Sequence, residues 1–451
     1  MKKISTITLL ILFFCALTLQ GAEKNMDQLV DEYLSTYQKL GKFSGTVLVA
    51  KEGNVVFNKS YGFACEEHSV PNDSNTKYRI GSLTKSFTAA AILQLEQHGL
   101  LSLDDPLGKY LENYPRGEEI LIKHLLSHTS GIPDHTELPG YDTDRRVYPV
   151  KIEDTIATFK GKELEFTPGS KFKYSNSGYI LLGCIVEKVS GKDYATYIRE
   201  SLLEPNGLSN SGFEEGLAVI PSYAHGYSRD GSKLIRAKYR NINNTQASGG
   251  LYSTVEDLYK WDRVLRSDEL LSQEVKDRHY SIENAPYSCG WGIAELFGRR
   301  MLGHNGETDG YKSTIMRFVD DDVCVIVLSN QEATPIGKLA VDLSAIVFGK
   351  SYTVPTLPEN QNTDVCILKK YEGFYELKPG FVFHISRDGN QLFCQATGQG
   401  KLTLTPITET KFQVVEVNAS IEFKIDGEGK VFALVLAQGG REFTAKRTEQ
   451  S

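Results

Sequence analysis

The segment around Ser82 carries residue types that could perform nucleophilic chemistry. In Ser82-Leu83-Thr84-Lys85 the serine and the lysine are three residues apart. On a helix these positions share one face, so the amine of Lys85 could reach the hydroxyl of Ser82. A helix N-terminus would also favour negative charge on the attacking oxygen. The pattern therefore predicts a serine nucleophile that is activated by a lysine.

The same spacing occurs twice more, in residues 74–77 and 170–173. A helix-capping serine followed by a surface lysine gives this pattern without any catalytic role. Only Ser82 precedes an apolar stretch, residues 87–95, that is typical of a buried helix. The other two serines lie among turn residues, so Ser82 is the favoured candidate.

A second motif, Tyr174-Ser175-Asn176, contains a phenol and an amide. A phenolic oxygen beside a lysine ammonium is stabilised as a phenolate, which could take the serine proton and return it to a leaving group. The amide of Asn176 could hold both the lysine and a substrate carbonyl. A tyrosine and an asparagine with this spacing recur at residues 239–241, so the motif alone is also consistent with an ordinary loop tyrosine.

A third motif, His304-Asn305-Gly306, precedes a predicted strand. A glycine on an edge strand would let a substrate backbone approach closely, and the next backbone N–H, that of Glu307, could point into an oxyanion hole. Taken alone, the histidine is equally explained as a solvated hairpin residue.

The order and separation of the three motifs resemble the serine β-lactamase and penicillin-binding protein superfamily, in its class C-like branch. The resemblance covers roughly residues 29–328. It extends to residues 78–82, 124–131, 168–169, 248–251 and 303–306. The stretch Tyr371-Glu372-Gly373-Phe374-Tyr375 is similar to a lipocalin-like β-barrel that is often appended to such enzymes.

The resemblance implies a role for each motif residue. Ser82 would be the nucleophile, and Lys85 and Tyr174 its activating pair. The substrate-binding residues would be Asn176, His304, Asn305 and Gly306, and the oxyanion hole would consist of the backbone N–H groups of Ser82 and Glu307. Water would release the acyl group, and the chemistry implies no metal and no cofactor.

One departure from the family pattern affects the substrate. Many members have Lys-Thr-Gly where this chain has His304-Asn305-Gly306. A lysine is a permanent cation that pairs with a substrate carboxylate, whereas a histidine titrates near neutrality. The substitution favours hydrolysis of esters or amides, including peptides with D-amino acids. A true class C-like β-lactamase or D-alanyl-D-alanine carboxypeptidase is the alternative, and a non-hydrolytic β-lactam- or peptide-binding or sensing module is another.

The N-terminus predicts export. Lys2 and Lys3 precede an apolar stretch, residues 7–19, and the small residues Gly21 and Ala22 follow. This arrangement is typical of a signal peptide, here residues 1–22, and it predicts a periplasmic or secreted protein with no membrane span after cleavage. A retained N-terminal anchor is the alternative.

The rest of the chain predicts two domains of an α+β fold. We expect a hydrolase domain over residues 23–352, with an antiparallel sheet flanked by helices and a helical subdomain. Residues 355–364 are polar and read as a linker, and residues 353–451 predict an all-β barrel of short alternating strands. Expected elements are helices at 26–40 and 82–98, and hairpins at 45–61 and 314–328.

Composition limits the partners. The 451 residues carry a net charge of -7, which is unsuited to binding nucleic acid. A small-molecule or short-peptide substrate is expected, including one derived from the cell wall, and the oligomeric state is not predicted. His124 and His128 are four residues apart but lack the glutamate of a metalloprotease helix, so a structural role is expected.

Overall fold

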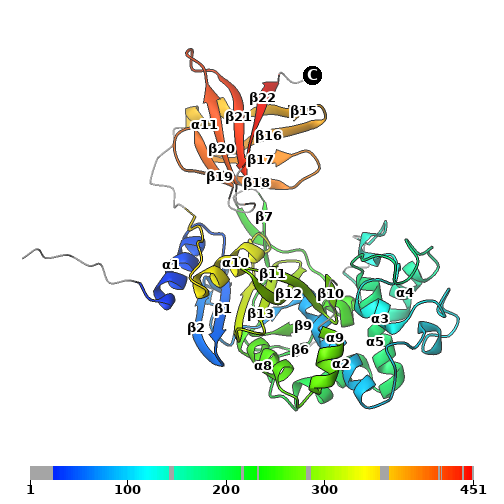
Figure 1. The fold of residues 1–451 in the computed structure, drawn as a ribbon. Helices are drawn as coiled ribbons and strands as arrows, with labels where there is room; N and C mark the ends of the chain where they lie inside the picture. Colours follow the sequence, from blue (N-terminus) through cyan, green and yellow to red (C-terminus); the bar gives the residue numbers. More distant parts are fainter. Residues whose placement is uncertain are drawn as a thin grey trace, which may run out of the picture.

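The computed structural model describes residues 24–141, 147–214, 218–230, 233–280, 286–355, 365–414, 417, 419–438 and 441–448. The predicted signal peptide, and the predicted linker from residue 356 onward, lie outside these residues. Within them, an α+β part is followed by a β-barrel, which Figure 1 shows as a separate body above it.

A seven-stranded antiparallel sheet forms the centre of the α+β part, in the order β10-β11-β12-β13-β14-β1-β2. Its strands are β1 (Gly45–Lys51), β2 (Asn54–Tyr61), β10 (Tyr287–Ser288), β11 (Trp291–Leu296), β12 (Arg299–Thr308), β13 (Tyr311–Phe318) and β14 (Val323–Ser329). The sheet confirms the two hairpins that the sequence predicts at residues 45–61 and 314–328. Strand β1 pairs with β14, so the first and last strands of this sheet in chain order are neighbours.

Helices cover both faces of the sheet (Figure 1), and β14 shows why. Its side chains alternate, as strand geometry requires. Val323, Val325 and Val327 pack in one core with α1 (Met26–Lys39) and α10 (Ile336–Val347). The intervening Cys324, Ile326 and Leu328 belong to the opposite core, which contains residues of α2 and α8. A central strand that is buried on both faces reads as a continuous apolar run.

Helix α2 (Thr84–Gln97) is buried almost all round, which identifies it as the central helix of the α+β part. Its Phe87 ring stacks on Trp261 of α8 (Val255–Arg266), with the ring centres 4.2 Å apart. The helical subdomain packs on α2, where α5 contacts α2, α3 and α7. The remaining helices are α3 (Ile122–Leu126), α4 (Ile152–Lys160), α5 (Asn176–Ser190), α6 (Tyr194–Ile198), α7 (Gln246–Gly249) and α9 (Gln273–Tyr280).

Short strand pairs connect these layers. They are β3 (Phe63–Cys65) with β4 (Val70–Pro71), β5 (Tyr78–Arg79) and β6 (Gly212–Phe213) with β9 (Leu251–Ser253), and β7 (Tyr227–Asp230) with β8 (Lys233–Arg236). The pairing of β5 with β9 holds the segment before Ser82 against the segment that follows α7.

The C-terminal part is a closed barrel of eight antiparallel strands, preceded by α11 (Val365–Tyr371). The strands are β15 (Gly373–Lys378), β16 (Phe381–Asp388), β17 (Gln391–Ala396), β18 (Lys401–Pro406), β19 (Lys411–Val414), β20 (Ala419–Ile425), β21 (Val431–Gln438) and β22 (Arg441–Thr448). Pairing of β15 with β22 closes the barrel and leaves neither strand as an open edge. The predicted all-β barrel is therefore confirmed.

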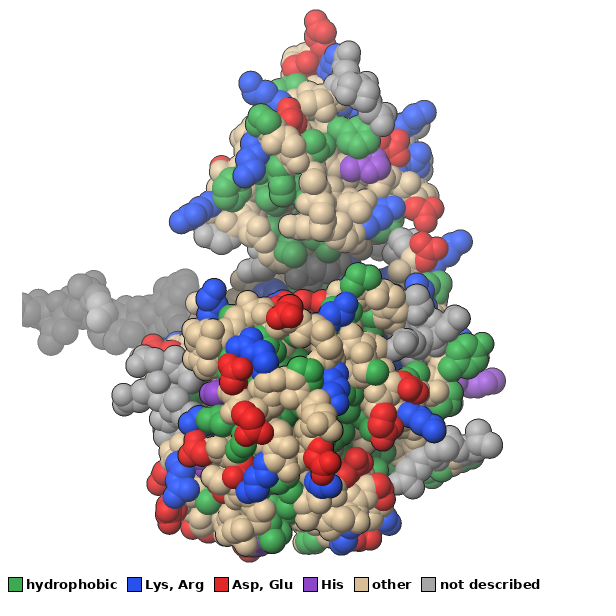
Figure 2. All heavy atoms as spheres, turned by 90° about the vertical axis from the view of Figure 1, so that its right-hand side faces the viewer, with side chains coloured by type: hydrophobic (Ala, Val, Ile, Leu, Met, Phe, Trp, Pro, Cys, Tyr) green, Lys and Arg blue, Asp and Glu red, His purple; other side chains and the backbone are tan. Residues whose placement is uncertain are grey.

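The surface carries charges of both signs. On the face in Figure 2, Lys and Arg side chains are interspersed with Asp and Glu over both the α+β part and the barrel. In the part of the chain that the structure describes, no helix combines the length and apolar character needed to cross a membrane.

Candidate active site

Ser82 lies in the turn that leads into the central helix. The sequence predicts that a helix begins near Ser82; in the structure residues Gly81–Leu83 form a 3₁₀ turn, and α2 begins at Thr84. The Thr84 hydroxyl donates to the Gly81 carbonyl at 2.8 Å and tightens this turn. Gly81 has a φ of +51°, and a Cβ there would lie 2.8 Å from the backbone nitrogen of Glu307. A glycine is therefore required where the nucleophile turn meets strand β12.

Lys85 is buried and surrounded by three oxygen atoms. Its Nζ lies 3.0 Å from Ser82 Oγ, 2.8 Å from Asn176 Oδ1 and 2.7 Å from the Ser248 carbonyl oxygen. Burial lowers the pKa of Lys85 to about 7, and the negative charge of Asp134 opposes part of this shift. The lysine therefore exchanges its proton near neutrality, as a general base requires.

A charged amine can donate to all three oxygen atoms, and a neutral amine can also be accommodated. A neutral lysine has two hydrogens and one lone pair. Asn176 Oδ1 and the Ser248 carbonyl can only accept hydrogen bonds, so they take the two hydrogens. The lone pair then faces the Ser82 hydroxyl, which can donate its proton to it.

Tyr174 lies beside this pair, with its ring centre 4.9 Å from Lys85 Nζ. Burial raises the pKa of Tyr174 above its usual value, and a hydrogen bond with Ser82 offsets only part of the rise. The sequence predicts a phenolate here, and the pKa shift runs in the opposite direction. The phenol keeps its proton, which leaves Lys85 as the better proton acceptor.

Asn176 links the lysine to a carboxylate that sequence reasoning missed. The amide Nδ2 donates to Asp134 Oδ2 at 2.9 Å, while Oδ1 accepts from Lys85. Asp134 is buried and also accepts from the backbone N–H of Thr136 at 3.0 Å. The amide orientation is thereby fixed toward the lysine and the carboxylate. Asp134 lies in a turn with no periodic pattern, three residues beyond the resembling stretch at 124–131, and its role appears only when that turn meets α5.

Strand β12 provides the opposite wall. The sequence places His304-Asn305-Gly306 before a strand, with the glycine on a strand edge, but the motif lies within β12, which runs between β11 and β13. Pairing with β11 ends at Gly303, so the segment beyond it has a locally free edge. Gly306 is needed there, because a Cβ would lie 1.9 Å from the Ile80 carbonyl oxygen.

His304 is held as a neutral side chain. Its Nε2 lies 3.0 Å from the Tyr287 hydroxyl, and its Nδ1 lies 2.6 Å from the Asn305 carbonyl oxygen. Burial and the charge of Lys85 lower the pKa of His304 to about 3. The sequence suggests a histidine that carries a partial charge near neutrality; the lowered pKa removes even that charge.

Two hollows meet at Ser82 and Glu307. One has a volume of about 200 Å³ and is also lined by Asn176, Arg240 and Ser248. The other, of about 590 Å³, is lined by Ser82, Gly306, Glu307, Lys312 and Lys338 among others. Ser82 and Glu307 therefore line one cleft, while Lys85 is buried behind Ser82 and contacts its hydroxyl.

The cationic side chains that line these hollows already have anionic partners. Arg240 pairs with Asp309. Lys312 pairs with Glu307 at 2.6 Å, and Lys338 pairs with Asp342 at 2.6 Å. A substrate carboxylate would therefore have to compete with these three carboxylates for the lining cations.

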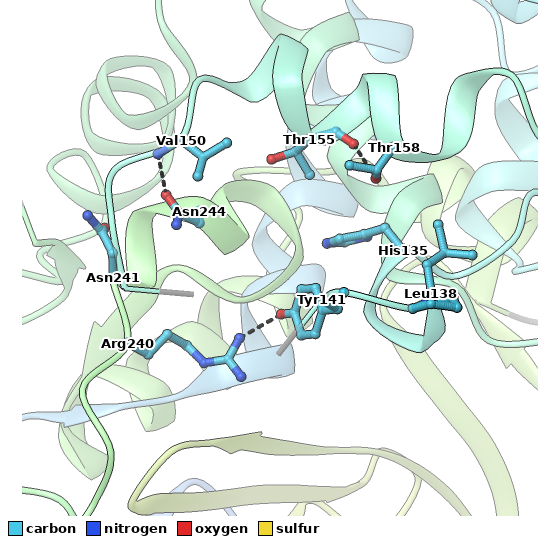
Figure 3. A pocket seen from close by; sticks show the side chains of 11 residues that line it. His135, Leu138, Tyr141, Val150, Thr155, Thr158, Arg240, Asn241 and Asn244 are labelled. Carbon is cyan, nitrogen blue, oxygen red and sulfur yellow. Dashed lines mark hydrogen bonds between the residues drawn. The ribbon is translucent and has the colours of Figure 1, made fainter. Parts of the chain in front are cut away.

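A side pocket of about 390 Å³ adjoins the smaller hollow and shares His135, Tyr141 and Arg240 with it. Figure 3 shows Leu138 and Val150 at its apolar margins and Arg240 donating to the Tyr141 hydroxyl, a contact of 2.6 Å. The pocket combines apolar walls with a few polar groups, which is typical of a site for a substrate side chain.

The other candidate patterns are structural. Lys173 pairs with Glu165 at 2.6 Å, and Lys77 donates to the Pro221 carbonyl at 3.0 Å, so neither lysine serves its neighbouring serine. His124 and His128 each accept a backbone N–H, from Leu121 and from Ser175. These contacts agree with the structural role expected for the two histidines.

The fold and the contact between Ser82 and the buried Lys85 define a serine hydrolase. The Beta-lactamase family model matches residues 26–345, and a domain family of unknown function, DUF3471, matches residues 357–450. A penicillin-binding protein of Bacillus subtilis (strain 168) is 30% identical over 454 residues, which cover 94% of this chain and all of that protein. The chain belongs to the β-lactamase family.

Solved structures share the architecture. The octameric penicillin-binding protein homologue from Pyrococcus abyssi is 30% identical with a TM-score of 0.65, over 93% of this chain and 99% of that one. The D-amino acid amidase from Ochrobactrum anthropi SV3 is 19% identical with a TM-score of 0.65, over 72% of this chain and 99% of that one. The second likeness concerns the fold alone.

Proposed function

We propose that the protein is an exported hydrolase that cleaves an amide or ester bond through an acyl-enzyme on Ser82. The observation that carries this proposal is the 3.0 Å contact between the buried amine of Lys85 and the Ser82 hydroxyl. The basic and apolar N-terminal residues, read as a signal peptide over residues 1–22, support export. On this view the mature protein has a hydrolase domain, up to about residue 352, and a barrel domain.

The acylation step follows from the hydrogen bonds. Ser82 Oγ attacks the substrate carbonyl carbon while its proton moves to neutral Lys85. The backbone N–H groups of Ser82 and Glu307 would stabilise the oxyanion, since both residues line the cleft. Tyr174, which keeps its proton, would donate that proton to the leaving amine or alcohol and recover one from the Lys85 ammonium. The carbon–nitrogen or carbon–oxygen bond then breaks.

Deacylation returns the site to its starting state. A water molecule attacks the acyl carbon while its proton passes to neutral Lys85, and the Lys85 ammonium then returns a proton to Ser82 Oγ, which leaves as the hydroxyl. Asn176, held by Asp134, would keep Lys85 oriented through both steps. Asp134 is thus a positioning residue.

The cations that line the cleft are ion-paired and His304 is neutral, which favours substrates without a free carboxylate at the reacting end. His304 stands where a permanent cation occurs in many family members, and its pKa of about 3 leaves it neutral. The lining cations Arg240, Lys312 and Lys338 are paired. Amides, esters and peptides that contain D-amino acids fit this cleft, and a D-amino acid amidase and a D-stereospecific amidohydrolase are among the fold neighbours.

The side pocket and the β12 motif complete the proposed binding site. His304, Asn305 and Gly306 would lie along the substrate backbone, beside the free edge of β12. The pocket that contains Leu138 and Tyr141 would accept the side chain on the acyl side. A substrate with an apolar or aromatic acyl-side residue is expected to be preferred.

A substrate panel tests the proposal. Purified protein and Ser82→Ala would be compared on D- and L-phenylalanine amides, their methyl esters, penicillin G and a peptide that ends in D-alanyl-D-alanine. Faster turnover of a D-amide or D-ester, abolished in Ser82→Ala, supports the proposal. Preferred turnover of penicillin G or of the D-alanyl peptide would instead identify a β-lactamase or a carboxypeptidase. Stable acylation without turnover would favour a sensing module.

A further inference from the structure

Cys65, Glu67 and His225 bring three metal-ligand atoms together outside the cleft. Cys65 Sγ lies 3.5 Å from Glu67 Oε2 and 3.6 Å from His225 Nδ1, and His225 Nδ1 lies 3.6 Å from Glu67 Oε2. Among the described residues, this is the group whose thiol, imidazole and carboxylate lie mutually close enough to share one ion. None of the three lines the hollows around Ser82.

The triangle has the dimensions of a tetrahedral zinc site. Zinc binds sulfur at about 2.3 Å and imidazole nitrogen or carboxylate oxygen at about 2.0–2.2 Å. Tetrahedral angles then place the ligand atoms about 3.3–3.6 Å from one another. The three observed separations lie within or close to this range, so an ion could bind with little movement of the side chains.

Hydrogen bonds connect the backbone segments that contain Cys65 and His225. The His225 N–H donates to the Ala64 carbonyl at 2.8 Å. The Asn330 amide donates to the carbonyls of Phe63 and His225, both at 2.9 Å. These bonds hold the end of β3 and the segment before β7 side by side. Pre-organisation of this kind lowers the entropic cost of binding an ion.

The carboxylate also has supporting contacts. The Tyr227 hydroxyl donates to Glu67 Oε2 at 2.5 Å, and Arg236 pairs with the other oxygen. Such partners orient metal ligands in known sites.

We propose that Cys65, Glu67 and His225 bind a divalent transition ion of the zinc class. The thiolate and the carboxylate would neutralise the two charges of the ion. Cys65 is 9% exposed, whereas the His225 side chain is 49% exposed. This open side admits the ion and leaves room for water as the fourth ligand. The ion would tie together two segments that are 160 residues apart in the chain.

Cobalt substitution tests the proposal directly. The full chain, stripped with a chelator and titrated with Co²⁺, is expected to bind one equivalent and to show a thiolate-to-cobalt charge-transfer band with tetrahedral visible bands. Zinc should displace the cobalt and raise the melting temperature. Cys65→Ser should abolish the charge-transfer band, and His225→Gln should weaken binding at least 10-fold. Cys184→Ser removes another free, partly buried thiol and should change nothing.

Tyr227→Phe provides a variant that keeps all three ligands. It should weaken binding about 10–100-fold, which is the usual effect of removing a ligand's hydrogen-bond partner. Absence of a charge-transfer band in the folded wild-type chain would overturn the proposal, and the three side chains would then form a hydrogen-bonded cluster only. Unchanged cobalt binding in Cys65→Ser would overturn it equally. Ser82→Ala should retain the metal, because the site is independent of the proposed hydrolase chemistry.

Discussion

Lys85 Nζ lies 3.0 Å from Ser82 Oγ in a position that is closed to water, and burial brings the pKa of the amine to about 7. A lysine in water is almost fully charged at neutral pH and cannot accept a proton. Burial destabilises the charged ammonium of Lys85, so the neutral amine is present near neutral pH and can accept a proton. The reactivity of Ser82 is therefore linked to the packing of α2.

The first prediction concerns the pH dependence of acylation. The rate of Ser82 acylation should rise with pH through about 7, because only neutral Lys85 can take the proton. It should level off above that value, since Tyr174 stays protonated. Stopped-flow measurement with a chromogenic ester gives the profile when it spans about two pH units on either side of this pKa. A profile without a rise near 7 would speak against Lys85 as the base.

The second prediction concerns stability. Between pH 7 and 10.5 the unfolded chain holds a proton on Lys85 that the folded chain has lost. Raising the pH over this interval therefore stabilises the wild type relative to Lys85→Met, by about 1.4 kcal/mol per pH unit. Below the folded pKa both states are protonated, so the difference should stop changing.

Denaturant unfolding of both proteins across this pH range checks the second prediction. The informative quantity is how the difference in unfolding free energy between the two proteins changes with pH. Its absolute value is less informative, because the methionine also removes the hydrogen bonds to Asn176 and Ser248. Parallel pH curves for the two proteins would contradict a depressed pKa at Lys85.

The third prediction concerns Asp134. Its negative charge raises the pKa of Lys85, so Asp134→Asn should move the rise in the pH–rate profile to lower pH. The substitution should also lower kcat roughly 10-fold or more, because the asparagine no longer offers a carboxylate to the Asn176 amide. Glu137→Gln is a suitable control, since Glu137 is exposed and its partner is Lys173. A fall in kcat without a shift of the profile would mean that Asp134 acts on geometry alone.

The fourth prediction concerns substrate choice. His304→Lys should place a cation at the cleft and increase acylation by penicillin G roughly 10-fold or more through a charge-assisted contact with its carboxylate. Amide turnover should not increase. His304→Gln keeps a neutral polar side chain and should give no gain with penicillin G. Equal acylation rates for the lysine and glutamine variants would show that charge at this position does not limit recognition.

Patterning alone predicted most of the scaffold. The hairpin at residues 45–61 was predictable because β-branched runs flank Glu52-Gly53, and both residues have positive φ. The barrel strands followed from their alternation. Ser82 was separated from two similar motifs only by the apolar stretch of α2, which the structure buries almost completely.

What the sequence could not supply was the environment of each titrating group. Tyr174 was expected to ionise and His304 to carry partial charge, yet burial moves both toward the neutral form. Asp134 was missed because its importance comes from a hydrogen bond to Asn176, 42 residues away. The Cys65 cluster was invisible for the same reason, since His225 lies 160 residues beyond it.

In the proposed mechanism Ser82 becomes covalently acylated, with Lys85 as the base. Intact-mass spectrometry and peptide mapping after brief exposure to a fluorophosphonate and to a D-phenylalanine ester test it most directly. We predict one adduct per folded chain, located on the peptide that contains Ser82, absent in Ser82→Ala and strongly slowed in Lys85→Met. An adduct that persists in Ser82→Ala, or no adduct on the folded wild type with either reagent, would rule out Ser82 as the nucleophile.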